Sequence, residues 1–421
     1  MKRLLIATAL SALVAGPALA ADTTLKLTEV ITSPERTKTL EKIVKMFEDA
    51  NPGVHVEITS LPWGQAFEKF ATMVSAGDTP DVVEMPDRWQ ALYADSGRLE
   101  NLDPYLAKWD QTKNLNDRAL EMARVVGGKA YSLPYGFYLR ALFYNKALFK
   151  QAGIDGPPKT MAEFKADAKK ISAIPGKYGY CLRGGAGGYN GWLMFGAGMN
   201  GSGDFFKKDG TSTFTEPGWV KGFTWLADLY KKGYAPKDSV NWGFNEVVAG
   251  FYSGTCAMLD QDPDALIAIS ERMDPSQYDV TPFPKGPSGK AFPTLGYAGW
   301  AMFANSEHKD LAWKLIATLD GPKGNLMWNK RTGALPIYKS AEKDPFYQKP
   351  AFEGWFTELS DPDTHPLILP FRLKQFGFFA DSLVPQTSQK ALLGQITPEQ
   401  LAQKWADYLT KANKAYIAAH K

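Results

Sequence analysis

The stretch from Lys129 to Lys146, KAYSLPYGFYLRALFYNK, decides how the chain is organised. It is rich in aromatic residues, and Pro134 and Gly136 interrupt it where one long strand would otherwise run. Proline removes a donor from a sheet, and glycine permits close backbone approach. The alternating apolar positions that follow are typical of a strand buried on one face. We therefore predict that the chain leaves one sheet here, crosses a cleft and enters a second sheet; core aromatics around an ordinary bend are the alternative.

The length of the chain supports this prediction, because 421 residues exceed what one hydrophobic core usually organises. We expect an α/β fold of two lobes, each a mainly parallel sheet flanked by helices and joined by hinge crossings. A second crossing rich in glycine and aromatic residues lies at Leu295–Phe303, LGYAGWAMF. The predicted N-terminal lobe comprises 21–134 plus about 300–345, and the C-terminal lobe 135–299 plus about 346–421.

The first twenty residues have the pattern of a secretory signal peptide. Lys2 and Arg3 precede an apolar run, and Ala18-Leu19-Ala20 provides a small-residue cleavage site. No later apolar run approaches the 18 residues of a membrane span, so we expect an exported, soluble, periplasmic protein without membrane insertion. The formal charge is only +3 and lysines and arginines do not cluster, which makes a nucleic-acid partner unexpected.

The N-terminal region has a βαβαβ pattern. Strand-like runs at 25–31, 54–58 and 82–85 alternate with helical runs, the first of which has Ser33 as its N-cap and Pro34 in its first turn. Ligands of parallel sheets bind beyond the carboxyl ends of the strands. The three loops at those ends carry aromatic and fork-shaped polar side chains: Glu35, Arg36, Trp63, Gln65, Asp87 and Arg88. Each alone fits a helix cap or a surface group, but their recurrence in three equivalent loops favours a site.

Two further features leave alternatives open. The loop RGGAGGYNGW at 183–192 follows a strand and precedes a helix, so it presents backbone N–H groups to an anion or hydroxyls, or is a flexible turn. Cys181 and Cys256 lie in strand-like runs and either form a disulfide in the oxidising compartment or stay as buried thiols.

The candidate motifs for catalysis, cofactor binding and metal binding each lack a required feature. GAGMNG at 196–201 lacks the strand before it that a dinucleotide-binding turn requires. The acidic run at 260–264 has calcium-loop spacing, but Ala265 replaces the required glycine. The four histidines are scattered, and no nucleophile elbow is present. We therefore expect no metal, no cofactor and no catalytic residues.

Several segments together resemble the extracellular solute-binding proteins of ABC sugar importers, the group that includes maltose-, trehalose- and polyol-binding proteins. These segments span most of the chain: FEDANPGVHVEI (47–58), SAGDTPDVVEM (75–85), LPYG (133–136), FYNKALFKQAGI (143–154), GFYSGTCAML (250–259), GWAMF (299–303), KDLAWKLIATLDGPKGN (309–325) and TGALP (332–336). The resemblance implies a monomer that closes on a sugar or glycoside without catalysis and delivers it to a membrane permease.

By position, the resemblance also implies ligand contacts. Besides the six residues named above, they are Tyr135, Gly187, Trp242, Asp260, Trp300 and Arg331. Arg372 is a further candidate; with Arg36, Arg88, Arg331 and the glycine loop it either accommodates an anionic sugar or pairs with the site's own carboxylates. The ligand classes implied are disaccharides, sugar alcohols and sulfonated glycosides such as sulfoquinovosyl glycerol. The rival class is an exported glycoside-cleaving enzyme, which also uses aromatic clefts and carboxylates.

Overall fold

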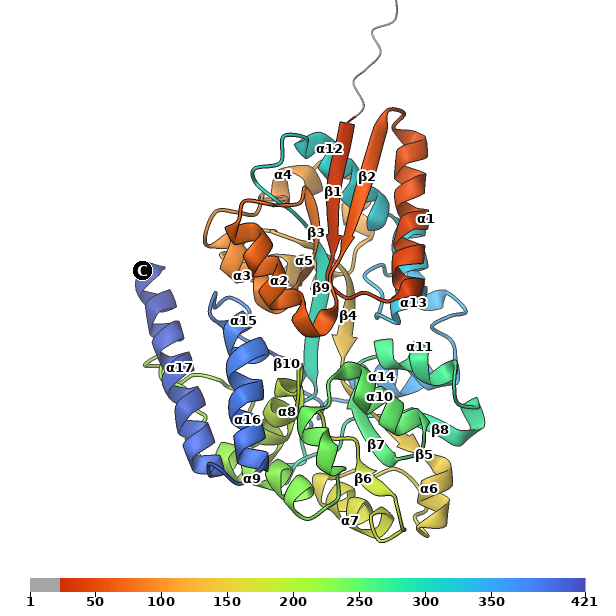
Figure 1. Ribbon diagram of the computed structural model, residues 1–421, viewed down its shortest axis with the longest axis vertical. Helices are drawn as coiled ribbons and strands as arrows, with labels where there is room; N and C mark the ends of the chain where they lie inside the picture. The colour runs from red at the N-terminus through yellow and green to blue at the C-terminus, as the bar shows by residue number, and fades with distance from the viewer. Residues whose placement is uncertain (1–22, 421) are drawn as a thin grey trace, which may run out of the picture.

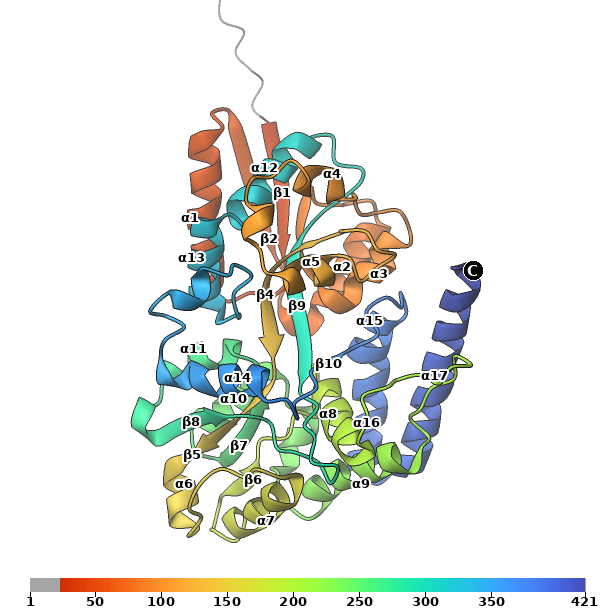
Figure 2. The same ribbon diagram turned by 180° about the vertical axis from the view of Figure 1, so that it is seen from behind.

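The computed structural model describes residues 23–420, so the predicted signal peptide lies outside the described residues. Two lobes, each with its own sheet, stand one above the other, as seen from opposite sides in Figures 1 and 2. The predicted two-lobed α/β fold is confirmed. Within the described residues, no helix combines the length and the apolar character that crossing a bilayer requires.

The first sheet has six strands in the order β10-β9-β3-β1-β2, with β4 also paired to β9. β1 (Thr23–Glu29) pairs in parallel with β2 (Val54–Ser60) and β3 (Val82–Pro86), as the βαβαβ pattern predicted. β9 (Thr294–Met302) is antiparallel to β3 and β4 (Leu133–Leu139), and β10 (Leu367–Ile368) is parallel to β9. The sheet is therefore mixed, because the returning strand β9 enters between β3 and β4 in the opposite direction.

The first helix of the first lobe begins where the sequence pattern predicted. α1 (Pro34–Ala50) starts after Ser33, whose hydroxyl accepts a hydrogen bond from the Arg36 N–H at 3.3 Å, and its apolar face is buried. α2 (Trp63–Ser75) and α3 (Asp87–Ala94) begin at the carboxyl ends of β2 and β3. The other helices here are α4 (Asp103–Leu106), α5 (Asp117–Ala123), α12 (Lys309–Leu319) and α13 (Pro322–Thr332).

The second sheet has four strands in the order β6-β7-β5-β8. β5 (Ala141–Asn145) is antiparallel to β7 (Cys256–Gln261) and β8 (Tyr278–Thr281), and only β6 (Tyr178–Tyr180) is parallel to β7. This sheet is thus mixed as well, contrary to the mainly parallel sheet expected. Its helices are α6 (Lys146–Gln151), α7 (Met161–Ile171), α8 (Tyr189–Asn200), α9 (Pro217–Lys231), α10 (Phe244–Tyr252) and α11 (Asp264–Ser270).

The chain changes sheets at Arg140, the single residue between β4 and β5. This is later than Pro134, where we expected the crossing, because the irregularity between Pro134 and Gly136 is a register shift within the β4–β9 pair. The predicted lobe limits at 134/135 and 299/300 fall inside β4 and β9, and the exact division of the chain into lobes stays a prediction.

The C-terminal segment adds a helical layer. α14 (Pro350–Ser360) packs on β8, whereas α16 (Val384–Leu392) and α17 (Pro398–Ala419) pack on α9 of the second lobe. Between α14 and α16 in the chain, α15 (Phe376–Phe378) contacts α3 of the first lobe and leads into a π-helix at Phe379–Leu383. Figure 1 shows α16 and α17 side by side at the outer edge of the molecule.

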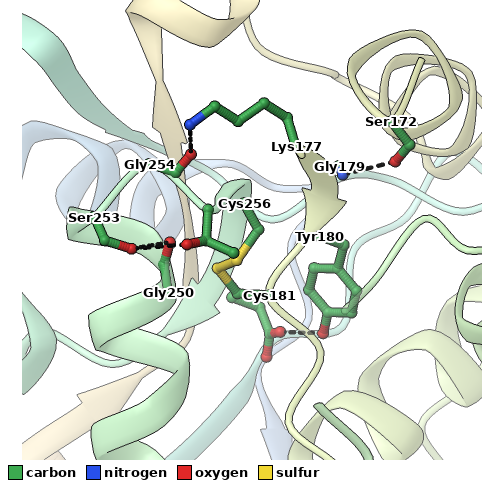
Figure 3. Close-up of a disulfide and its surroundings, with 11 residues drawn as sticks. Ser172, Lys177, Gly179, Tyr180, Cys181, Gly250, Ser253, Gly254 and Cys256 are labelled. Atoms are coloured by element: carbon green, nitrogen blue, oxygen red, sulfur yellow. Dashed lines mark hydrogen bonds between the residues drawn. A yellow bond between two sulfur atoms is a disulfide. The ribbon is translucent and has the colours of Figure 1, made fainter. Parts of the chain in front are cut away.

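A disulfide joins Cys181, just after β6, to Cys256 at the start of β7, with their Cα atoms 5.4 Å apart (Figure 3). The two strands are neighbours, and the Cys181 N–H donates to the Met258 carbonyl at 2.8 Å. Lys177 Nζ donates to the Gly254 carbonyl at 2.7 Å beside the bridge. Of the two alternatives left open by the sequence, the structure has the disulfide.

Candidate ligand-binding site

A cavity of about 540 Å³ lies between the two sheets and is lined from both lobes. The first lobe contributes the loops after β1, β2 and β3, as predicted for the carboxyl ends of parallel strands. The second lobe contributes the glycine loop at 183–190, the start of α10 and the segment 262–272. Tyr138 and Arg140 reach the cavity from the crossing. The cavity volume is in the range of small-molecule sites.

Arg36 is the first of several buried charged groups at the cavity wall. Its Nη2 donates to Glu84 Oε1 at 2.8 Å, and its guanidinium lies 4.8 Å from the ring centroid of Trp328. Tyr135 donates to the same Glu84 oxygen at 2.7 Å. Burial by itself lowers the pKa of Arg36, but the charge of Glu84 together with the hydroxyls of Tyr135 and Tyr138 outweighs burial, and the pKa is raised. Arg36 therefore stays charged and fixed at the wall.

Arg88 occupies the corresponding position after β3. Its Nε donates to Asp381 Oδ2 at 2.8 Å, and the Trp89 indole N–H donates to the same oxygen at 2.8 Å. The guanidinium lies 4.7 Å from the Trp63 ring centroid, within cation–π range. Burial raises the pKa of Asp87 to about 6, although Arg88 opposes the shift. The carboxyl group of Asp87, whose pKa is close to neutral pH, thus lies next to the fixed positive charge of Arg88.

Arg140 connects the crossing to the second lobe. Its Nη1 donates to Asp260 Oδ2 at 3.0 Å and to the Asp260 carbonyl at 2.8 Å, and its Nε lies 3.2 Å from Asp262 Oδ2. Tyr180 donates to the other Asp260 oxygen. Asp264, next along the wall, has one buried oxygen without a hydrogen-bond partner within the described residues. Burial and the neighbouring Asp262 raise the pKa of Asp264 to about 7.

Part of the predicted site does come together at the cavity. The predicted residues that line it are Arg36, Trp63, Asp87, Arg88, Gly187 and Arg331. Sequence reasoning missed other lining residues, namely Tyr138, Arg140, Arg183, Phe244, Asp262 and Asp264. The signal for Arg140 was a lone charge inside an apolar crossing, and the acidic run at 260–264 signalled the two aspartates.

Three predicted residues are buried behind the wall. Trp300 is fully buried between Tyr135 and Trp328, with ring centroids 5.7 and 5.6 Å away, so in this conformation it does not stack on a ligand. Tyr135 and Asp260 are also buried and act by holding Glu84 and Arg140. Strand positions that face the core carry the same residue types as strand positions that face a ligand. The sequence therefore did not show that these three residues belong to the core.

Four other predicted residues lie elsewhere. Glu35 and Gln65 are exposed, and Gln65 lines a smaller pocket beside Trp63. Trp242 is half-buried and packs close to Gly250 of α10. Arg372 donates to Asn413 Oδ1 at 2.9 Å. None of the four lines the cavity. Within residues 23–420, no group of three or more His, Cys, Asp or Glu side chains is arranged to hold a metal ion.

Similar structures share the whole fold. An ABC transporter solute-binding protein of Thermotoga lettingae bound with alpha-D-tagatose superposes with a TM-score of 0.81 at 24% identity, covering 93% of this chain and 99% of that chain. The maltose-bound MalE3 of T. maritima gives a TM-score of 0.79 at 24% identity, covering 92% and 99%. At this identity the likeness establishes the fold.

Sequence relatives establish the family. A binding protein of Brucella abortus (strain 2308) is 31% identical over 321 residues, which are 76% of this chain and 77% of that protein. The sn-glycerol-3-phosphate-binding periplasmic protein of Escherichia coli (strain K12) is 30% identical over 247 residues, about half of each chain. The model of the bacterial extracellular solute-binding proteins matches residues 32–326. The chain therefore belongs to the bacterial extracellular solute-binding protein family.

Proposed function

We propose that this protein is the periplasmic solute-binding component of an ABC importer. It captures a sugar or glycoside between its lobes and delivers the solute to a membrane permease, acting as a monomer. Relatives and structural neighbours that bind tagatose, maltose and glycerol 3-phosphate support this proposal. The ligand classes we consider are disaccharides, sugar alcohols and sulfonated glycosides.

The observation that carries the proposal is that the cavity is lined from both lobes. Arg36 and Arg88 belong to one lobe, and Asp264 and Phe244 belong to the other. A solute that contacts both lobes favours the arrangement in which both are near, so its binding energy is linked to closure. A permease that recognises the closed arrangement then distinguishes loaded from empty protein.

The chemistry of the wall suits a polyhydroxylated solute. The rings of Trp63, Tyr138 and Phe244 offer apolar faces to the C–H faces of a sugar. The guanidinium of Arg88 presents several N–H donors in a fork, and one carboxyl oxygen of Asp264 has no hydrogen-bond partner among the described residues. An unsatisfied buried polar group costs about 1–3 kcal/mol, so each hydroxyl that is matched or missing changes the affinity sharply.

A second candidate function is an exported glycoside-cleaving enzyme. It rests on the neighbouring carboxyl groups of Asp262 and Asp264, because the raised pKa of Asp264 is typical of a general acid beside a second carboxyl group. This candidate predicts turnover of a bound glycoside, whereas the importer component returns its solute unchanged.

Thermal-shift screening of the mature protein against sugars, sugar alcohols and sulfonated glycosides tests both candidates. A one-site ligand at 100 times its Kd stabilises the folded protein by about 2.7 kcal/mol. Hits are then measured by calorimetry with Arg88→Gln as the cavity variant and Arg372→Gln as the matched control outside the cavity. We expect stoichiometric binding that only Arg88→Gln weakens, and chromatography of the recovered solute shows whether it was cleaved. Equal affinities of both variants for every hit would contradict the proposed site.

A further inference from the structure

Within the part of the chain that the structure describes, six arginines line the cavity, and five of them have a carboxylate oxygen within salt-bridge distance. The pairs are Arg36–Glu84 at 2.8 Å, Arg88–Asp381 at 2.8 Å, Arg140–Asp260 at 3.0 Å, Arg272–Glu271 at 3.3 Å and Arg331–Glu271 at 3.0 Å. The sixth, Arg183, has no carboxylate oxygen within 4.0 Å among residues 23–420. The charge of Arg183 therefore lacks the direct partner that every other cavity arginine has.

The glycine loop holds Arg183 in place rather than forming a flexible turn. Arg183 Nε donates to the Ala186 carbonyl at 2.6 Å, and its guanidinium lies 5.8 Å from the Phe244 ring centroid. Gly187 has a φ of +83°, and a Cβ there would lie 2.4 Å from the Arg183 guanidinium carbon. The Gly184 N–H donates to the Ser239 carbonyl at 3.0 Å, and this anchors the loop to the second lobe. The loop geometry thus fits this one side chain.

The surrounding charges do not neutralise Arg183 locally. Burial lowers the pKa of Arg183 to about 10, and the like charge of Arg140 adds to the shift, while Asp262 and Asp264 oppose it. Asp262 is already engaged by Arg140 at 3.2 Å. The pKa of Asp264 is raised to about 7, so a substantial fraction of this carboxyl is protonated at neutral pH. A protonated carboxyl adds no countercharge and can itself donate to an anion.

We propose that Arg183 binds an anionic group of the solute, a phosphate, sulfonate or carboxylate, and that the transported class is an acidic glycoside or polyol ester. This inference rests on the proposed solute-binding function. A guanidinium binds such groups through two parallel hydrogen bonds. In Arg183 only Nε takes part in the hydrogen bond to the Ala186 carbonyl, and the two terminal nitrogens do not. The five arginines with carboxylate partners stabilise the cavity wall, and Arg183 supplies the positive charge that selects the solute.

Calorimetry with matched pairs of solutes tests this inference. The pairs are glycerol with glycerol 3-phosphate, glucose with glucose 6-phosphate, glucose with glucuronate, and glucosyl glycerol with sulfoquinovosyl glycerol. We expect the anionic member of the recognised pair to bind about 100-fold more tightly than its neutral partner, as a bidentate charge contact allows. Arg183→Gln should remove most of this preference, Arg183→Lys should keep part of it, and Arg372→Gln should leave it unchanged.

The unliganded protein gives a second readout. Removing a cation that has no direct partner should leave the Tm of Arg183→Gln unchanged or higher, whereas Arg140→Gln breaks a buried ion pair and should lower it. A neutral sugar that binds as tightly as its anionic partner would overturn the inference and leave the solute-binding function standing. A drop in Tm for Arg183→Gln as large as that for Arg140→Gln would also overturn it. If no solute binds at all, the proposed function itself fails.

Discussion

Asp381 provides the sharpest test of how the lobes are coupled. It lies in the π-helix at 379–383, within a helical layer packed on the second lobe, yet its carboxylate accepts hydrogen bonds from Arg88 and Trp89 of the first lobe, both at 2.8 Å. The side chains of Arg88 and Asp381 are only 6% and 12% exposed. We expect Asp381→Ala to destabilise the protein and to weaken solute binding.

The expected magnitude follows from the burial of the pair. Removing one partner of a buried ion pair costs about 3–5 kcal/mol, because the remaining charge is left without a partner. Asp87 lies 3.8 Å from Arg88 and retains part of the attraction, which places the loss at the lower end of that range. Trp89 also loses the one acceptor that its indole N–H has among residues 23–420. Asp381→Asn keeps a hydrogen-bond acceptor and should cost less.

The assay is urea unfolding followed by circular dichroism, with the Kd measured in parallel by calorimetry. Asp407 is an exposed aspartate on α17 of the same layer, so Asp407→Ala is the matched control. We expect a loss of about 3 kcal/mol for Asp381→Ala, and a Kd raised at least about tenfold because Arg88 is no longer held at the cavity. Unfolding of Asp381→Ala at the same urea concentration as Asp407→Ala would refute the coupling.

Three other perturbations have defined outcomes. The double variant Cys181→Ala/Cys256→Ala opens a bridge with a sequence separation of 75, and urea unfolding should show a loss near the chain-entropy value of about 4.5 kcal/mol; a loss below about 1 kcal/mol would contradict that account. Burial and the neighbouring Asp262 raise the pKa of Asp264 to about 7, so the contribution of Asp264 to folding stability is lost as the pH rises from about 4 to about 7. Asp264→Asn should therefore raise the urea midpoint more at pH 8 than at pH 5, and equal shifts at both pH values would exclude this linkage. Gly187→Ala should cost about 1–2 kcal/mol for its left-handed backbone and also displace Arg183, so calorimetry should show weaker binding of the anionic solute, whereas a normal Kd would argue against the tight fit of the loop.

Some of the site could be predicted because local signals determine it. The cap at Ser33, the alternating strands and the helical faces between them define a βαβαβ unit, and parallel strands bring their carboxyl ends to one edge. Arg36, Trp63 and Arg88 lie at the cavity for this reason. The interrupted aromatic stretch likewise predicted a crossing between sheets, which the structure places at Arg140.

The sequence by itself determined the two-lobed α/β plan, the parallel strands of the first βαβαβ unit and the loops that border the site. Only the tertiary structure decided which aromatic rings are buried and which arginines are paired. Trp300 is inaccessible because β9 inserts between β3 and β4, and Arg88 is held by a carboxylate 293 positions away along the chain. Such contacts depend on how distant segments pack, and no local periodicity or spacing encodes them.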